Sequence, residues 1–262
     1  MCGRFSLKNS RDEVEAALGA LIPDDFPPRY NIAPTQPILI VMPSETVRPV
    51  GSNRPDRAGH LVRWGFVPSW VKDPNARAPI FNIRSETAAE KNSFKAALSH
   101  RRVLVPASGF YEWRRNGSNR AQPYWIRPRH GGVIAFGALM ETWSGADGSQ
   151  IDTAGILTTG ANEALSLIHH RMPVVVVPED YARWMDCKHY LPREVADIMQ
   201  PAPDDLFEAI PVSDLVNKVS NTSPDVQLPV SADLTATATR PKKAGKKTGA
   251  DDDSGNGQLS MF

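Results

Sequence analysis

The sequence predicts an α+β fold with a mainly antiparallel β core, bent or barrel-like, and short flanking helices. Many short runs of strand-forming residues follow one another with few helical segments between them, which is typical of this class. The chain has 262 residues, of which 41% are hydrophobic. That content is enough for one large core or two small ones. No apolar run approaches the ~20 residues that a membrane span needs, so we expect no membrane partner.

The helices are predicted from capping residues and from apolar residues at helical spacing. Ser10, with Glu13 three residues later, forms a capping box that opens a short helix through about Leu21. The segment 86–100 has apolar residues on one helical face. Further short helices are predicted at residues 161–168, 179–187 and 193–199.

The strands are predicted from short apolar runs between turn signals. The proline-rich segment 27–34 predicts a loop, and the polar segment 51–59 predicts a turn or surface loop. Residues 116–119 predict a hairpin turn between two strands. Strands are predicted at residues 38–41, 61–68, 102–107, 109–114, 124–127, 133–140, 151–159 and 173–177.

The composition changes at about residue 231, where Thr, Ala, Lys, Gly and Asp replace the apolar residues. Such a segment has almost nothing to bury and is typical of disorder. We therefore predict a domain over residues 2–230, a disordered linker over 231–257 and a short terminal motif over 258–262.

Charge and cysteine content exclude several classes of function. Thirty Lys and Arg residues against 29 Asp and Glu give a net charge of +1, which argues against wholesale coating of nucleic acid. Two cysteines make no disulfide framework, and the N-terminus carries no secretory signal, so we expect a cytoplasmic protein. No CxxC, HExxH or Walker-type motif is present, so we expect no metal and no cofactor.

Cys2 is the first candidate for chemistry. Removal of Met1 would leave an α-amine and a thiol on one residue, with ordinary pKa values of about 7.7–8.0 and about 8.5. An aldehyde can condense with the amine and then be captured by the sulfur in a five-membered thiazolidine. For position 2 alone, an incidental residue near a frayed terminus is the better explanation. The adjacent Gly3 and Arg4 favour chemistry, because they allow close approach and supply a cation.

Three further segments carry polar residues that have either a structural or a chemical role. Asn82 and Arg84 precede a predicted helix, where ordinary helix-start residues explain them well. Glu112 shares a strand face with Phe110, so its carboxylate either points into an apolar interior, which would raise its pKa, or lies on a solvated face. His169 and His170 end a predicted helix, where a cation is favourable without any chemistry.

Together these segments resemble the ordered blocks of the SRAP family, the SOS-response-associated peptidases, better described as abasic-site sensors. The match covers about Cys2 to Val219. The segments are MCGRF (1–5), RYNIAP (29–34), WGFVPSW (64–70), NIRSET (82–87), GFYEW (109–113) and IHHRMP (168–173).

The resemblance implies four residues that act on an abasic site in single-stranded DNA. Cys2 would cross-link to the ring-opened aldehyde through a thiazolidine. Glu112 would relay protons between amine, imine and thiol. His169 would assist opening of the deoxyribose ring by protonating its ring oxygen, and Asn82 would orient the cysteine amine or the sugar.

The resemblance also implies a DNA groove. Arg4, Arg84 and Arg171 match family positions that hold flanking phosphates, which suits the forked donors of a guanidinium. Tryptophans and a proline loop would stack on bases or wedge between them, and a threonine would touch the backbone. These residues are Trp70, Trp113, Asn31, Pro34 and Thr158.

Two positions depart from the family pattern. Ile83 stands where the family usually has alanine, so the pocket would be tighter if Ile83 faced the site. His170 stands where the family usually has aspartate, so a carboxylate near the reactive histidine is lost and the pH optimum would differ.

Two other classes of function remain open. One is a cysteine hydrolase that uses Cys2, His169 and Glu112 or Asn82, including removal of its own Met1. The other is a non-enzymatic DNA-binding adaptor whose output lies in its tail. A shallow arginine-lined groove would favour DNA, whereas a peptidase would want a deep side-chain pocket and an oxyanion hole.

The last five residues, Gln258 to Phe262, end a polar tail with apolar side chains. They resemble the short motif by which bacterial repair and replication proteins dock on the polymerase sliding clamp. Gln258 would bond at the pocket rim, while Leu259, Met261 and Phe262 would fill apolar pockets. A chance match is the alternative, because short motifs arise often. We therefore expect as partners single-stranded DNA with abasic sites and the sliding clamp, with the protein a monomer that joins the nucleoid during repair.

Overall fold

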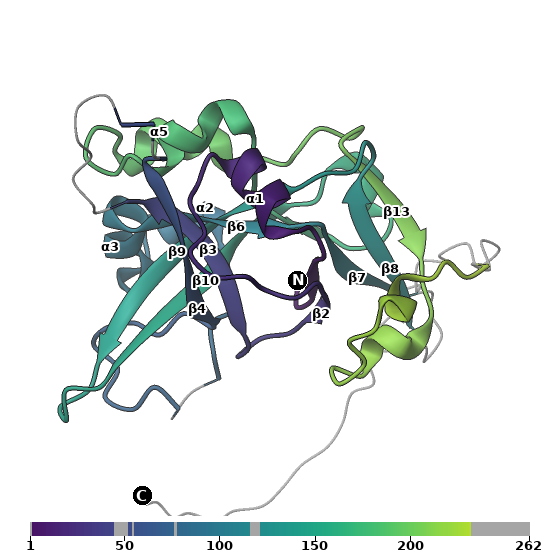
Figure 1. Ribbon diagram of the computed structural model, residues 1–262, viewed down its shortest axis with the longest axis horizontal. Coiled ribbons are helices and arrows are strands. Elements are labelled where there is room, and N and C mark those ends of the chain that lie inside the picture. The colour runs from purple at the N-terminus through teal and green to yellow at the C-terminus, as the bar shows by residue number, and fades with distance from the viewer. Residues whose placement is uncertain (1, 45–51, 54, 76–77, 116–120, 232–262) are drawn as a thin grey trace, which may run out of the picture.

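The computed structural model describes residues 2–44, 52–53, 55–75, 78–115 and 121–231. Its strands form two sheets, and the start of the chain lies between them (Figure 1). The expected α+β class with a mainly antiparallel, barrel-like core is confirmed. The predicted hairpin turn at 116–119, the linker from 232 onward and the motif at 258–262 lie outside the described residues.

The larger sheet closes into a barrel, because β10 pairs with β4 on one side and with β9 on the other. Its pairs are antiparallel except those of β10 with β4 and β5. The ring consists of β3 (Pro37–Pro43), β4 (Arg57–Trp64), β6 (Arg102–Ala107), β9 (Ile134–Ser144) and β10 (Gln150–Gly160). The strands added at its edges are β5 (Asn82–Arg84), β11 (Arg171–Pro173) and β12 (Val175–Val176).

The smaller sheet has five antiparallel strands and supplies the second wall of the site. Its order is β13 (Phe207–Pro211), β8 (Ala121–Pro128), β7 (Gly109–Arg115), β1 (Phe5–Leu7) and β2 (Arg29–Ile32). β1 follows directly on the N-terminal residues, so this sheet fixes where the chain starts.

The helices are short and lie outside the strands (Figure 1). In α1 (Arg11–Leu18) the predicted capping box is confirmed, because Ser10 and Glu13 exchange side-chain to backbone hydrogen bonds. The helix ends before Leu21 at Gly19, whose φ of 57° is left-handed. The other α-helices are α2 (Ser85–Ala88), α3 (Asn92–His100), α4 (Glu163–Ser166) and α5 (Tyr181–Met185). The 3₁₀ helices are η1 (Pro178–Asp180), η2 (Pro192–Met199), η3 (Asp214–Asn217) and η4 (Pro224–Gln227). Among the described residues no helix is long and apolar enough to cross a membrane.

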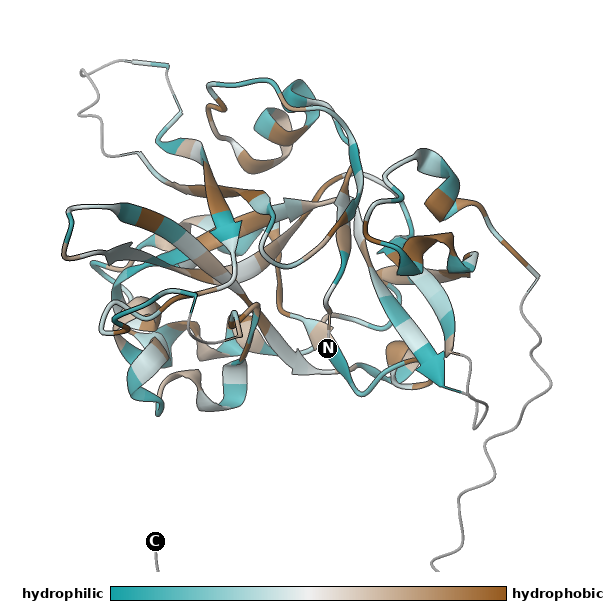
Figure 2. Ribbon diagram, turned by 90° about the horizontal axis from the view of Figure 1, so that it is seen from below, coloured by the Kyte–Doolittle hydropathy of each residue, from teal (hydrophilic) through white to brown (hydrophobic). Residues whose placement is uncertain are grey.

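Phe5 joins the two sheets through the core. Its ring packs edge-on against Trp64 of the barrel, with centroids 5.1 Å apart, and against Phe136 at 6.0 Å. Phe110 of the smaller sheet packs on the same Phe136. Apolar residues gather on the inner strands, as Figure 2 shows. Phe5 therefore anchors the start of the chain, including Cys2 three positions before it.

Two secondary-structure predictions were wrong. The predicted loop at 27–34 contains the edge strand β2, where flanking prolines are tolerated because one side of the strand needs no ladder hydrogen bonds. The single helix predicted over 86–100 is two helices, α2 and α3. They break apart because α2 packs on β10 while α3 packs on β6 and β9.

Candidate active site

Cys2 is fully buried where the two sheets meet, although it is the second residue of the chain. Its Sγ donates to the carbonyl oxygen of Arg4 at 3.5 Å. Burial, and then the nearby Glu112 carboxylate, raise the pKa of the thiol far above its usual value. The thiol is therefore protonated at neutral pH, and its proton must be removed before the sulfur reacts as a thiolate.

The pairing of β1 with β7 brings the chain start to Glu112. Phe5 lies opposite Phe110, and the backbone N–H of Tyr111 donates to the Arg4 carbonyl at 2.9 Å. Continuing this antiparallel register places Gly3 opposite Glu112. A residue without a side chain therefore lies where the backbone passes the carboxylate.

Glu112 itself is buried, with 3% of its surface exposed. This settles the open question from the sequence: the carboxyl faces the interior, as its strand neighbour Phe110 does. Burial raises the pKa of Glu112 to about 7, so both protonation states are populated near neutral pH. A group with this pKa can both accept and donate a proton under physiological conditions.

Asn82 approaches Cys2 from the barrel side. Its Nδ2 donates to the Cys2 carbonyl oxygen at 2.7 Å. Its Oδ1 is buried and accepts no hydrogen bond from any described residue. The amide therefore fixes the backbone of Cys2 and keeps one acceptor for a further donor.

His169 lies beside Glu112, with 3.7 Å between Nδ1 and the nearer carboxylate oxygen. The same Nδ1 contacts the backbone N–H of Arg171 at 3.1 Å and the Arg171 carbonyl at 3.2 Å. Nδ1 can accept a hydrogen bond from the Arg171 N–H when it carries no proton, and it can donate to the Arg171 carbonyl when it carries one. The imidazole ring is therefore held in place in both protonation states. Burial lowers the pKa of His169, which favours the neutral imidazole at pH 7. The helix before His169, α4, has only four residues, so stabilisation of a helix C-terminus by a cation explains little of why a histidine stands at this position.

Arg171 is bonded inside the protein. Its guanidinium forms a bidentate ion pair with Glu86. It also donates to the carbonyl oxygen of Thr158 at 2.6 Å and to its hydroxyl at 3.2 Å. Thr158 is fully buried. Arg171 thus contacts His169 through its backbone and Thr158 through its side chain, and the contacts of Arg171 and Thr158 with DNA stay predictions. Glu86 lies within the NIRSET segment, but no function was predicted for it, because its ion pair with Arg171 is visible only in the structure.

Arg4 and Asn31 are also bonded to the protein. Arg4 donates to the Asn31 side chain and to the Val216 carbonyl, each at 2.7 Å, and more weakly to Asn217. Asn31 is 3% exposed and donates to the same carbonyl at 3.2 Å. These contacts fasten the chain start to η3, and the predicted phosphate and groove contacts of the two residues remain untested.

The other predicted DNA residues lie nearer the surface. Trp70 is 59% exposed, and the indole of Trp113 donates to Asn217 at 2.7 Å. Pro34 is half-buried in a turn whose next residue, Thr35, has a φ of 74°. A β-branched residue in that region costs about 1–3 kcal/mol and is typical of functional turns.

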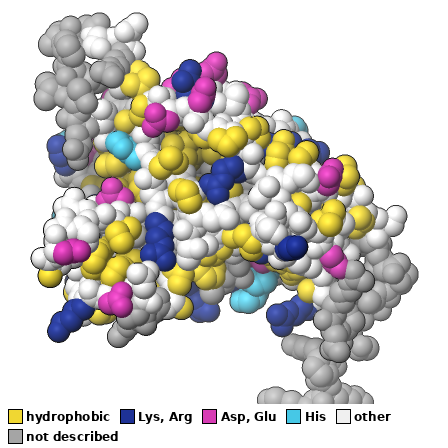
Figure 3. Space-filling view, turned by 60° about the horizontal axis from the view of Figure 1, so that its bottom comes forward, with side chains coloured by type: hydrophobic (Ala, Val, Ile, Leu, Met, Phe, Trp, Pro, Cys, Tyr) yellow, Lys and Arg dark blue, Asp and Glu magenta, His cyan; other side chains and the backbone are white. Residues whose placement is uncertain are grey.

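Basic side chains are spaced apart on the face shown in Figure 3, consistent with the low net charge.

The two departures from the family pattern have different outcomes. Ile83 is 1% exposed and packs in the core on the opposite face of β5 from Asn82 and Arg84, so its larger side chain does not narrow the site. His170 is exposed, and its ring stacks on His169 with centroids 4.4 Å apart.

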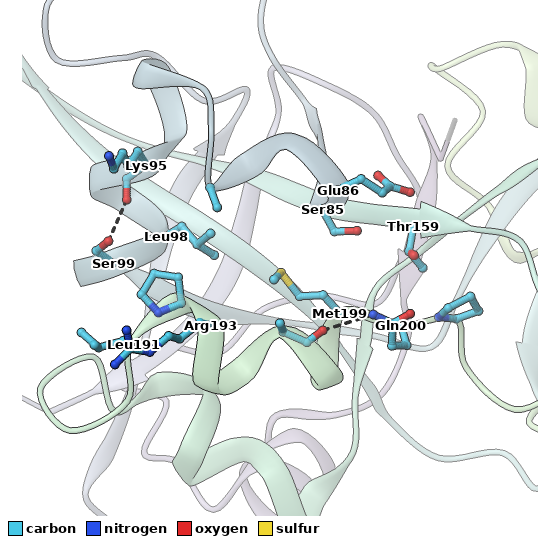
Figure 4. A pocket seen from close by; sticks show the side chains of 14 residues that line it. Ser85, Glu86, Lys95, Leu98, Ser99, Thr159, Leu191, Arg193, Met199 and Gln200 are labelled. Atoms are coloured by element: carbon cyan, nitrogen blue, oxygen red, sulfur yellow. Dashed lines mark hydrogen bonds between the residues drawn. The ribbon is translucent and has the colours of Figure 1, made fainter.

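Two cavities adjoin this region. One, of about 690 Å³, is lined by Glu112 and His169. The other is an apolar groove of about 730 Å³ between α3 and η2, with Leu98 and Met199 on its floor (Figure 4). Cys2 does not line this groove, so it is no side-chain pocket for a Cys2 peptidase. Among the described residues no group of three His, Cys, Asp or Glu side chains could hold a metal ion.

Known proteins resemble the chain over most of its length. The family model "SOS response associated peptidase (SRAP)" matches residues 1–219. "Abasic site processing protein YoqW" of Bacillus subtilis is 36% identical, over 86% of this chain and 98% of that protein. "Abasic site processing protein YedK" of Escherichia coli is 32% identical, over 88% and 100%. "Abasic site processing protein HMCES" of Rattus norvegicus is 31% identical, over 89% and 77%. A crystal structure of a Bacteroides thetaiotaomicron protein has a TM-score of 0.76 at 21% identity, covering 87% of this chain and all of the other.

Proposed function

Because the chain belongs to the SOS response associated peptidase (SRAP) family, we propose that it processes abasic sites in DNA, as the names of its relatives say of them. We propose further that it does so by forming a covalent thiazolidine between Cys2 and the lesion in single-stranded DNA. The adduct would shield the lesion during replication.

One observation carries this proposal: a buried Cys2 with Asn82 on its carbonyl and the Glu112–His169 pair beside it. The reaction needs a nucleophilic amine, a thiol and groups that move protons. After Met1 is removed, the amine, thiol and proton-transfer groups lie together.

The steps follow from these positions. An abasic deoxyribose must first open: the bond between C1′ and the ring oxygen breaks, the ring oxygen gains a proton from the protonated fraction of His169, and the C1′ hydroxyl loses one. The aldehyde then condenses with the Cys2 amine to give an imine and one water. The thiol adds to the imine carbon while its proton passes to the nitrogen, which closes the ring.

Glu112 suits the proton transfers between these steps. With a pKa of about 7 it accepts a proton from the thiol or ammonium and returns it to the hydroxyl that leaves as water. Asn82 keeps one buried acceptor, Oδ1, which would hold the amine of mature Cys2. Glu112 on β7 and Asn82 on β5 would thus both act on Cys2 from the positions that they already hold.

The hydrolase alternative rests on the same Cys2. It includes removal of Met1 by the protein itself, with Cys2 as nucleophile and Glu112 and His169 as proton carriers. The mass of recombinant Glu112→Gln protein separates the cases: Met1 lost as in wild type supports a host aminopeptidase, and Met1 retained supports self-processing.

A second proposal concerns the tail. We propose that Gln258, Leu259, Met261 and Phe262 bind a polymerase sliding clamp, with the segment 231–257 as a tether that raises the local concentration of the domain near replicating DNA. Support comes from the residue pattern and its place at the end of a polar segment.

The proposed reaction is tested on a denaturing gel. Wild-type protein is incubated with a single-stranded oligonucleotide carrying an abasic site, and in parallel with one carrying a tetrahydrofuran analogue, which cannot open to an aldehyde. We expect a band that survives denaturation with the abasic site alone. No such band would reject the covalent mechanism, while equal bands with both oligonucleotides would reject the aldehyde as the electrophile.

A further inference from the structure

Two strands of the site carry the same arrangement of residues. On β5, Asn82 is followed two positions later by Arg84, and on β7, Glu112 is followed two positions later by Arg114. Residues two apart on a strand lie on one face, about 7 Å from each other. Each sheet therefore presents one residue of the reaction centre and, further along the same face, one arginine.

Arg84 and Arg114 differ from the other arginines of the site in their partners. The guanidinium groups of Arg4 and Arg171 are bonded to protein carbonyls and to Glu86. Both residues pair through their backbones within the sheets, but in the part of the chain that the structure describes no hydrogen bond or ion pair holds the guanidinium group of either Arg84 or Arg114. Both can therefore bind an external anion without breaking an existing bond.

Arg114 lines the 690 Å³ cavity that Glu112 and His169 also line. Arg115 and His170 also line this cavity. Of the described residues that line this cavity, Glu112 is the acidic one, and its side chain is buried. The more exposed charged residues of the lining, Arg114 and Arg115, are therefore basic, which suits an anionic ligand that reaches in toward the reacting residues.

We propose that Arg114 binds a DNA phosphate next to the abasic sugar, different from the phosphate that Arg84 binds. The strand is then held by one arginine from each sheet, with the reacting sugar between Asn82 and Glu112. This inference rests on the proposed function and adds a phosphate contact to it. A guanidinium bound to a phosphate gives position along the strand and no sequence preference.

The test measures non-covalent binding of single-stranded DNA that carries the tetrahydrofuran analogue, using the full mature chain at several salt concentrations. Each phosphate contact contributes about 0.7 to the slope of log K against log salt, or about fivefold in affinity at 0.1 M relative to 1 M salt. We expect Arg114→Gln to lower the slope by about 0.7, and Arg84→Gln with Arg114→Gln to lower it by about twice that. Arg114→Lys should keep the slope, because the charge remains.

Arg193→Gln is the matched control, since Arg193 is exposed and lies outside this cavity, on η2. It should leave the slope unchanged. A second arm replaces single phosphates near the lesion by neutral methylphosphonates: one substitution should weaken binding by wild type and have little effect on Arg114→Gln.

The outcomes separate this inference from the proposed function. If wild type cross-links an abasic site but Arg114→Gln keeps the wild-type slope, Arg114 binds no phosphate and the proposed function stands. If every methylphosphonate weakens wild type and Arg114→Gln equally, the inference is likewise overturned. If wild type neither binds nor cross-links, both fail.

Discussion

Asn82 donates a hydrogen bond of 2.7 Å from its side-chain amide to the backbone carbonyl of Cys2. The two residues are 80 positions apart: Asn82 lies on β5, at the edge of the barrel sheet, and Cys2 precedes β1 of the smaller sheet. This bond is the direct link between the barrel and the nucleophile, and it holds the chain start over Glu112.

Asn82→Ala should therefore slow cross-linking more than it weakens DNA binding. The variant loses one hydrogen bond worth about 0.5–1.5 kcal/mol, and the freed chain start samples unproductive positions. We expect a loss of about tenfold or more in the rate of adduct formation, measured by quenched time points on denaturing gels. Asn75→Ala, at an exposed loop asparagine, is the control. A wild-type rate for Asn82→Ala would remove Asn82 from the reaction centre.

Glu112 should make the free energy of unfolding depend on pH. Its folded pKa of about 7 lies above the ordinary value of 4.5, so the folded protein binds the proton more tightly than the unfolded chain. The resulting stability is fully present below pH 4.5 and is lost as pH rises through about 7. The loss approaches about 1.4 kcal/mol per pH unit within that window.

The measurement is chemical denaturation of wild type and Glu112→Gln from pH 5 to pH 8. Glutamine does not titrate, so the stability of the variant relative to wild type should increase with pH. A difference that stays constant would mean that Glu112 keeps an ordinary pKa. Denaturation of Glu208→Gln, a half-buried strand carboxylate paired with Arg127, provides a control for removing an ionisable group.

His169 and His170 should differ sharply although they are neighbours. His169 contacts Glu112 and the Arg171 backbone, whereas the side chain of His170 is exposed and its ring stacks on that of His169. His169→Ala should bind single-stranded DNA normally but cross-link about 10²–10⁴-fold more slowly, as for loss of one general acid–base group. His170→Ala should be mild. Equal losses of binding and rate in His169→Ala would make it a structural residue.

The tail motif can be tested apart from the domain. A peptide covering residues 249–262 should bind the cognate sliding clamp in calorimetry, and a peptide with Leu259, Met261 and Phe262 changed to alanine should not. Absence of heat at ~100 μM, which corresponds to about −5.5 kcal/mol, would reject the motif.

Much of the fold was predictable because its signals are local. The capping box at Ser10 and the long apolar strands β6, β9 and β10 were expected near their observed positions. The short strands β1, β5 and β13 were not, since three to five residues carry no periodic signal and their pairing depends on distant partners.

The site was predictable as a set of residues through its motifs, and less so in its contacts. Glu112 was left open between core and solvent until the register of β7 placed it inside. Arg171 forms an ion pair with Glu86, and Arg4 donates hydrogen bonds to Asn31 and to η3. These partners lie far apart in the sequence, and no spacing rule predicts such pairs.

The most direct test of the central claim combines intact mass with thiol counting on the adduct. A thiazolidine has the mass of mature protein plus oligonucleotide less one water, and an imine has the same mass. The chain has two cysteines, Cys2 and Cys187. Alkylation of the denatured adduct should therefore modify one thiol, at Cys187, while free protein is modified at both, and Cys2→Ala should give no adduct. An adduct in which both thiols are alkylated, or a wild-type yield from Cys2→Ala, would contradict the thiazolidine.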